Sequence, residues 1–224
     1  MDNPWHRLPT TVPYVVPEDR PHVEAFNELF GGGDGRYRLD PRLHPEPFMG
    51  RRDADLVLLA RNPGISPGDY AVHTEPRYLR ALRANLEDDP AGHVVTALID
   101  EFADTPAGCW WRPRLRQLAE HCGSEEELAR RILIVEFHGY HSKNWRPVGV
   151  TLPTQAFGFS LVANAVRRRA TILITRGADD WSVAVPAIRA HDRVYRLNSH
   201  RNSAVSVGNL GPKAFERVLA ALDR

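Results

Sequence analysis

Four short runs of apolar residues are the feature that most constrains how this chain can fold. They read ADLVLLA, RILIVEF, ATILITRG and RVYRLNS, and they span residues 54–60, 131–137, 170–177 and 193–199. Each run is rich in Leu, Ile or Val and lacks the period of an amphipathic helix. Such runs are typical of strands that are buried on both faces of a parallel sheet.

Helical patterns separate these runs. We expect one helix to begin near Pro113, and others over residues 22–30, 76–88, 91–104, 124–131, 155–169, 182–191 and 213–224. Ser124 and Glu127 have the spacing of a capping box, and Thr154 is a candidate N-cap for the helix after it. Because each link between parallel strands needs a covering helix, the sequence predicts an α/β fold. We expect a three-layer sandwich with a central parallel sheet of about four strands.

Length and composition predict a single domain over residues 1–224. The 224 residues, of which 42% are hydrophobic, are enough to bury one core, and residues 1–50, with many prolines and the run FGGGDG, look like a loop-rich segment that wraps a core of residues 51–224. Cys109 and Cys122 are too few for a disulfide scaffold or for an iron–sulfur cluster held by four thiolates, and no metal or other cofactor is required. The oligomeric state is not determined by the sequence.

The N-terminal sequence and the net charge limit the classes of partner that we expect. The N-terminal residues have prolines and charges where a signal peptide needs an apolar run, and no window is long and apolar enough for a membrane span. We therefore expect a soluble, cytoplasmic protein without a membrane partner. The net charge of +1 gives no global attraction to nucleic acid, so any DNA contact requires a local cluster of basic groups.

The loops after the four expected strands carry the candidate site. They read RNPGISPGD, HGYHSKNW, RGADDW and SHRNSAVSVGN, and they concentrate polar, aromatic and small residues. In open parallel sheets, ligands bind beyond the carboxyl ends of the strands, where the loops diverge and helix N-termini point outward. The sequence therefore predicts a binding site at this edge of the sheet.

Asn62, at the tip of the first loop, is the most specific candidate. Pro63 pushes the backbone of Asn62 towards extended geometry, and Gly64 allows a ligand or another backbone to approach closely. A carboxamide held in this way can orient a water molecule or grip a polar ligand. The alternative is that Asn-Pro-Gly only turns the chain, as these residues often do. The chain has no Gly-x-Ser-x-Gly, Walker or dinucleotide-binding motif, which disfavours acyl transfer and ATP hydrolysis.

The second loop allows two interpretations. Phe137 and Tyr140 offer rings for stacking, whereas Glu136, His138 and His141 offer a possible set of metal ligands. The histidines can also simply bond local backbone carbonyls. Basic side chains on the predicted ligand edge are candidates for binding a phosphate, and they are Lys143, Arg146 and Arg201.

Two of these loops carry a resemblance to a known family. DLVLLARNPGISPGD, together with a late strand that leads into SHRNSAVSVGN, resembles the uracil-DNA glycosylase superfamily, and most of all its mismatch-specific uracil/thymine glycosylases. The resemblance implies that Asn62 positions the attacking water while Pro63 and Gly64 shape the floor of the pocket. Arg61 stands where those enzymes usually have a small residue.

The second motif of that family grips the base and the adjacent phosphate. By the resemblance, this role falls to a group of residues in the last loop, namely His200, Arg201, Asn202, Ser203 and Ser206. Which of His200, Arg201 and Asn202 takes the main role is left open. The other residues expected to contact the base are Tyr70, Phe137, His138 and Tyr140.

The resemblance predicts a protein that binds a base flipped out of DNA and hydrolyses its N-glycosidic bond, with Asn62, His200 and Asn202 as catalytic residues. Asp69 is the only carboxylate expected near Asn62, so we expect slow turnover or none. One alternative is a protein of the same fold that binds a base or nucleotide without catalysis. Another is a metal-dependent hydrolase that uses Glu136, His138 and His141. DNA, RNA and free nucleotides all remain open as substrates, as does the identity of the base.

Overall fold

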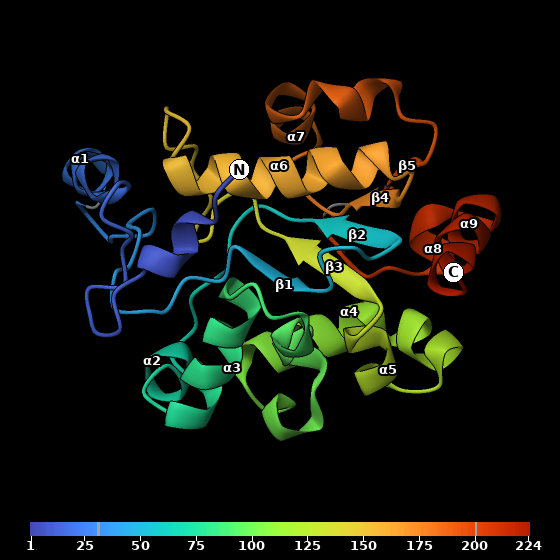
Figure 1. Ribbon diagram of the computed structural model, residues 1–224, viewed down its shortest axis with the longest axis horizontal. Coiled ribbons are helices and arrows are strands. Elements are labelled where there is room, and N and C mark those ends of the chain that lie inside the picture. The colour runs from blue at the N-terminus through green and yellow to red at the C-terminus, as the bar shows by residue number, and fades with distance from the viewer. Residues whose placement is uncertain (31, 200) are drawn as a thin grey trace.

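A mostly parallel sheet of five strands forms the centre of the protein. The computed structural model describes residues 1–30, 32–199 and 201–224 (Figure 1). The strands are β1 (Phe48–Gly50), β2 (Leu56–Leu59), β3 (Ile132–Val135), β4 (Thr171–Ile174) and β5 (Val194–Arg196), in the order β1-β3-β2-β4-β5. β2 is parallel to β3 and β4, and β4 is parallel to β5. Strands β2 to β5 all lie within the four ranges expected from the sequence.

β1 was not predicted, and it makes the sheet mixed. It lies at the end of the segment 1–50 and pairs with β3 in the antiparallel direction. Three residues are too few to give a strand pattern in the sequence. The strand closes on Gly50, which has a φ of +99°, and a Cβ atom there would lie 2.1 Å from the carbonyl oxygen of Ile132. Only glycine permits both this backbone conformation and this approach.

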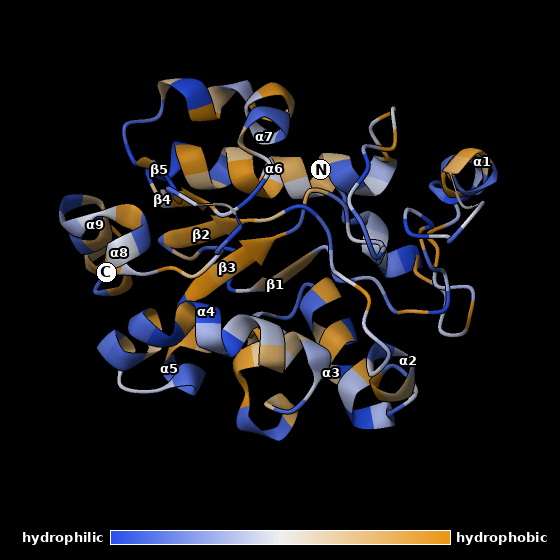
Figure 2. Ribbon diagram, turned by 180° about the vertical axis from the view of Figure 1, so that it is seen from behind, coloured by the Kyte–Doolittle hydropathy of each residue, from blue (hydrophilic) through white to orange (hydrophobic). Residues whose placement is uncertain are grey.

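Successive residues of the central strands point into two separate cores. Val57, Leu133 and Ile172 belong to one core, and the residues before or after them, such as Leu58 and Ile134, belong to the other. Every residue of β2, β3 and β4 is buried. Figure 2 shows these hydrophobic strands in the middle of the molecule, between helices of mixed hydropathy.

Helices cover both faces of the sheet (Figure 1). The α-helices are α1 (Arg20–Phe30), α2 (Asp69–Val72), α3 (Pro76–Leu86), α4 (Pro106–Cys122), α5 (Glu125–Ala129), α6 (Pro153–Arg167), α7 (Ala178–Ala184), α8 (Val207–Leu210) and α9 (Pro212–Leu222). The 3₁₀ turns are η1 (Pro4–Arg7), η2 (Pro90–Gly92), η3 (Thr96–Leu98), η4 (Asp100–Phe102) and η5 (Pro186–Ala190). α6 and α7 lie on one side of the sheet and α3, α4 and α5 on the other. None of the described helices combines the length and apolar character needed to cross a bilayer.

Some helix boundaries differ from the sequence-based prediction. Residues 91–104 form the short turns η2, η3 and η4 instead of a helix, because Val95 donates its backbone N–H to Ala129 at 3.0 Å rather than to a helical partner. α4 begins well before Pro113, since the side chain of Thr105 accepts a hydrogen bond from the N–H of Gly108 and caps the helix. The strong N-terminal cap and long packed face outweigh the one hydrogen bond that Pro113 lacks.

The starts of two later helices also differ. The N-cap position of α6 is Leu152, and the predicted cap, Thr154, instead hydrogen-bonds to the buried Asp19. The helix expected over residues 182–191 begins earlier and is divided at Pro186 into α7 and η5. Proline lacks the N–H that would continue the helical hydrogen bonds, which explains the division.

The N-terminal segment is part of the core. Trp5, Tyr14, Val16 and Phe26 pack in the same cluster as α6 and one face of the sheet. The hydroxyl of Tyr140 donates to Asp19 at 2.7 Å and so ties this segment to the loop after β3.

Candidate functional site

A pocket of about 440 Å³ lies at the carboxyl ends of β2, β3 and β4. Glu136 directly follows β3 and Thr175 directly follows β4, and both line the pocket together with the tip after β2. Trp110 and Trp111, near the start of α4, and Trp145, from the loop after β3, add aromatic walls. The pocket therefore lies at the edge of the sheet that the sequence indicated.

The first and last predicted motifs both contribute to this pocket. Asn62, Pro63 and Gly64 lie on its wall, and so does Ser203 from the loop after β5. These segments are about 140 residues apart in the chain, and parallel pairing of β2 with β4 and of β4 with β5 brings their ends to one edge. The two loops thus share a single cavity.

Hydrogen bonds from the loop after β3 hold the Asn-Pro-Gly tip. The backbone N–H groups of His138 and Ser142 donate to the carbonyl oxygens of Arg61 and Pro63, at 3.1 and 3.2 Å. The Nδ2 group of Asn62 donates to the hydroxyl of Ser142 at 3.0 Å and also to backbone carbonyls. Its donors are thus engaged, while Oδ1 accepts no hydrogen bond from the described residues. Asn62 therefore has an anchored amide nitrogen and a free acceptor.

The last loop has its own anchors. Ser203 is buried, and its hydroxyl accepts a hydrogen bond from Nε of Arg114 at 2.9 Å. Asn209 donates through Nδ2 to the carbonyl oxygens of Ser199, Asn202 and Ala204, which closes the loop on itself. The side chain of Asn202 turns back to the N–H of Ala204 at 3.2 Å.

The other predicted residues of the last loop lie off the pocket wall. Arg201 and Asn202 are exposed, and Ser206 occupies the N-cap position of α8. None of these three lines the pocket. His200, predicted to be catalytic, lies outside the residues that the structure describes.

The predicted stacking residues also lie behind the pocket wall. Tyr140 is 1% exposed and packs on Trp5. Phe137 packs against Trp145 and Trp181, and His138 stacks on Trp145 with ring centroids 5.1 Å apart. In the loop after β3, the aromatic ring that lines the pocket is that of Trp145, which the sequence analysis did not single out.

Tyr70 lies away from the pocket. Its hydroxyl donates to Asp40 at 2.9 Å, and the guanidinium of Arg42 lies 4.7 Å from the centre of its ring. The side chain is 37% exposed and engaged in this small surface network. It does not line the cavity.

Cations surround the pocket. Arg61, Lys143 and Arg176 all line it. Arg61 lies 5.4 Å from the ring centre of Trp145, and Arg176 lies 5.1 Å from that of Trp110. Arg61 also donates through Nη2 to Asp180 at 3.3 Å, whereas the guanidinium of Arg176 makes no hydrogen bond to the described residues. The cation–π contacts hold both guanidinium groups at the pocket, where the remaining N–H donors can bind an anion.

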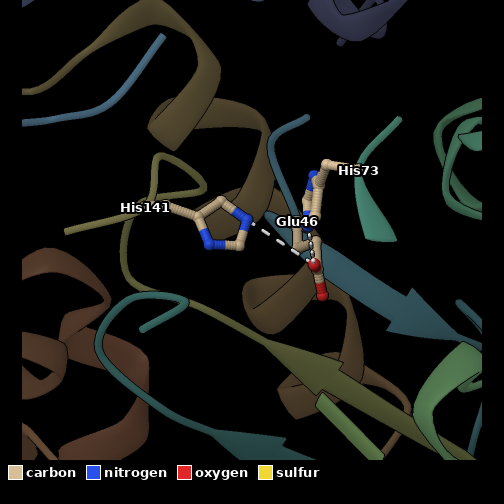
Figure 3. A group of neighbouring side chains, drawn as sticks. All are labelled: Glu46, His73 and His141. Carbon is tan, nitrogen blue, oxygen red and sulfur yellow. Dashed lines mark ion pairs between the residues drawn. The ribbon is translucent and has the colours of Figure 1, made fainter. Parts of the chain in front are cut away.

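The candidate metal ligands that come together differ from the predicted set. His141 lies beside Glu46 and His73 rather than forming a group with Glu136 and His138, and the potential ligand atoms of these three lie within 4.8 Å of one another. Figure 3 shows the three side chains pointing toward one another. Nothing in the sequence pattern around Glu46 or His73 indicated this cluster.

Hydrogen bonds occupy the lone pairs that a metal would need. The N–H of His44 donates to Nδ1 of His73 at 2.9 Å, so the ring proton of His73 lies on Nε2, facing Glu46. Nδ1 and Nε2 of His141 lie 2.7 and 3.1 Å from the carbonyl oxygens of Gly64 and His44, so both nitrogens donate. A coordinating imidazole needs a free lone pair, and neither ring presents one.

The cluster is therefore a buried ion pair between Glu46 and His141. Burial alone would raise the pKa of Glu46, but hydrogen bonds from His141 and His73 and the positive charge of His141 outweigh it and hold that pKa well below its usual value. Burial likewise opposes the charge on His141, but Glu46 and the Gly64 carbonyl outweigh it and raise the pKa of His141. The imidazolium joins the segment before β1 to the Asn-Pro-Gly tip.

No protein-family model, curated protein or solved structure matches this chain.

Proposed function

We propose that this protein binds a nucleobase, flipped out of DNA or carried by a nucleotide-like ligand, in the pocket at the carboxyl ends of β2, β3 and β4, and hydrolyses its N-glycosidic bond. The observation that carries the proposal is the meeting of the Asn62–Gly64 tip and Ser203 on one pocket. An α/β sheet with helices on both faces supports the resemblance to the three-layer sandwich of the uracil-DNA glycosylases.

The pocket lining suits a flipped base. Enzymes that act on a base in DNA remove it from the stack and hold it by stacking and by hydrogen bonds to its edge. Trp110, Trp111 and Trp145 offer aromatic faces, and Arg61 and Lys143 offer cations for the neighbouring phosphates. A cavity of about 440 Å³ falls within the usual range of small-molecule pockets and suits a single nucleotide.

Asn62 would orient the attacking water through its free Oδ1. In the reaction, the water oxygen forms a bond to C1′ of the sugar while the bond from C1′ to the base breaks. The base leaves with the electron pair of that bond, one O–H bond of the water breaks and its proton is passed to the base, and the remaining hydroxyl stays on C1′ of the sugar. Donors beside the base, such as the hydroxyl of Ser203, would stabilise the negative charge that develops on it. Asp69 is engaged by the N–H of Ser66 at 2.6 Å, so general-base help is weak and we expect slow turnover.

The test is a cleavage assay on single-stranded and duplex oligonucleotides that contain uracil or mismatched thymine, with abasic product as the readout. We expect Asn62→Ala to lower the rate on the order of 100-fold because the water loses its acceptor. Asn164→Ala is the matched control, since Asn164 lies on α6 and contacts Arg167 outside the pocket. Equal rates for wild type and Asn62→Ala would refute the role of Asn62.

A binding titration with the same oligonucleotides distinguishes the non-catalytic alternative. Binding without abasic product would mean that the pocket grips a base and performs no hydrolysis. In that case Asn62 would contact the bound base, and Asn62→Ala would lower the binding affinity.

A further inference from the structure

Glu136 is a buried carboxyl group that the mechanism above does not use. It directly follows the last residue of β3, lines the pocket, and is only 7% exposed. Its Oε2 atom is buried and has no hydrogen-bond partner among the described residues. Leaving a buried polar atom without a partner is costly, so such an atom in a pocket wall indicates a partner supplied by a ligand.

The surroundings of Glu136 determine its charge. Burial, and then the nearby carboxylate of Glu46, raise the pKa of Glu136 to about 8, while Arg176 and His141 act in the opposite direction. Glu46 comes from the segment before β1, His141 from the loop after β3, and Arg176 from the loop after β4. Burial is the largest of these effects, and the charge of His141 offsets only part of the effect of its ion-pair partner Glu46, so the carboxyl group is protonated at neutral pH.

We propose that Glu136 is the base-recognition residue of the pocket, and that it acts as a neutral carboxylic acid that donates a hydrogen bond to an acceptor on the edge of the bound base. This inference rests on the proposed function and specifies its ligand. A neutral acid presents a donor and an acceptor side by side, which matches a heterocycle that has a carbonyl or ring nitrogen next to an N–H. A carboxylate presents acceptors only, and would place a negative charge against that carbonyl.

The experiment measures the affinity of deoxyuridine monophosphate and of a uracil-containing single-stranded oligonucleotide by calorimetry between pH 6 and pH 10. For the wild type, we expect a constant affinity up to about pH 7 and a decline of up to about tenfold per pH unit above pH 8, as the acid ionises. Glu136→Gln keeps a donor beside an acceptor but cannot ionise. Its affinity should therefore lack the decline above pH 8 that ionisation of Glu136 causes.

Glu136→Leu fills the same space without polar atoms, and we expect it to bind at least about tenfold more weakly than Glu136→Gln at pH 7. All variants meet the same ligand, so ionisation of the ligand itself affects them equally. Circular dichroism confirms that each variant is folded.

The outcomes separate this inference from the proposed function. An alkaline decline that persists unchanged in Glu136→Gln, or wild-type affinity in Glu136→Leu, would overturn the role of Glu136 and leave the function standing. Binding with the expected pH dependence but without cleavage would support Glu136 and overturn the hydrolysis. Absence of binding by either uracil ligand would overturn both.

Discussion

Glu136 directly follows β3, a strand that is buried on both faces, and its own carboxyl group is buried where water cannot stabilise a negative charge. The folded protein therefore keeps the proton on this group over a pH range in which the unfolded chain releases it. Such a group lowers the stability of the fold as pH rises from the usual pKa of a glutamate to the raised one. At the scale of the residue, the burial that keeps Glu136 protonated for ligand binding also lowers the stability of the folded protein.

Glu136→Gln should therefore stabilise the protein. The usual glutamate pKa is 4.5 and the raised value is about 8. At pH 7 this difference lowers the free energy of unfolding of the wild type by on the order of 3 kcal/mol, and the glutamine variant has no such loss. The sign follows from the unfolded state binding fewer protons between these two values. Urea denaturation at pH 4 and pH 7 measures this, and we expect the difference between the two proteins to vanish at pH 4. A gain that does not depend on pH would contradict the explanation.

At the scale of elements, the loop after β3 acts as a brace for the tip after β2. His138, His141 and Ser142 each contribute a hydrogen bond to the carbonyl oxygens of residues 61–64. His141 also faces Glu46, which precedes β1. The position of Asn62 therefore depends on two elements that are distant from it in sequence.

Replacing His141 by Gln should destabilise the protein in a pH-dependent way. The folded pKa of His141 is raised, so its contribution is fully present below the usual histidine value of 6.5 and is lost as pH rises through the folded pKa. We expect the free energy of unfolding to fall by about 3–5 kcal/mol at pH 6, because Glu46 loses its buried partner, and to fall by less at pH 9. Thermal unfolding at both pH values is the measurement, and an equal cost at both would argue against a charged His141.

β1 offers a test of the mixed sheet. Gly50→Ala would require a left-handed backbone in a residue with a Cβ atom and would push that atom against the carbonyl of Ile132, so we expect a loss of at least about 2 kcal/mol. Gly208→Ala is the control, since nothing lies within 4 Å of a Cβ at that position in α8. Chemical denaturation of both variants gives the comparison. A mild effect at Gly50 would mean that β1 can shift away from β3.

At the scale of the whole molecule, the N-terminal segment completes one of the two cores. Trp5, Val16 and Phe26 pack against the face of the sheet that α6 covers. Asp19 bonds both Tyr140 and Thr154, which ties this segment to the loop after β3 and to the start of α6. Residues 1–47 thus support the elements that carry the pocket.

Deletion of residues 1–47 should therefore abolish the folded state. Removing several buried aromatic and aliphatic side chains at once costs more than the usual stability of a domain, since each contributes about 2–5 kcal/mol. The matched control is deletion of Asp223 and Arg224, which are exposed at the other end of the chain. Near-ultraviolet circular dichroism and calorimetry test this, and a cooperative unfolding transition in the shorter chain would show that the segment is dispensable.

The sequence by itself determined the positions of β2 to β5 and the location of the pocket at their carboxyl ends. Strands buried on both faces need continuous apolar runs, and parallel pairing then fixes which loops meet, so local patterns were sufficient. The same reasoning predicted that the loop after the first of these strands and the loop after the last meet at one edge, and Asn62 and Ser203 from these loops both line the pocket.

Only the tertiary structure decided which side chains surround that site. Glu46 and Trp110 line the pocket from segments that carry no local signal of function, whereas Tyr140, a plausible stacking residue in the sequence, is turned into the core by its bond to Asp19. β1 likewise exists through its pairing with β3 and not through a pattern of its own. The physical reason is that periodicity reports which face of an element is buried, whereas the orientation and charge of a single side chain depend on neighbours from distant parts of the chain.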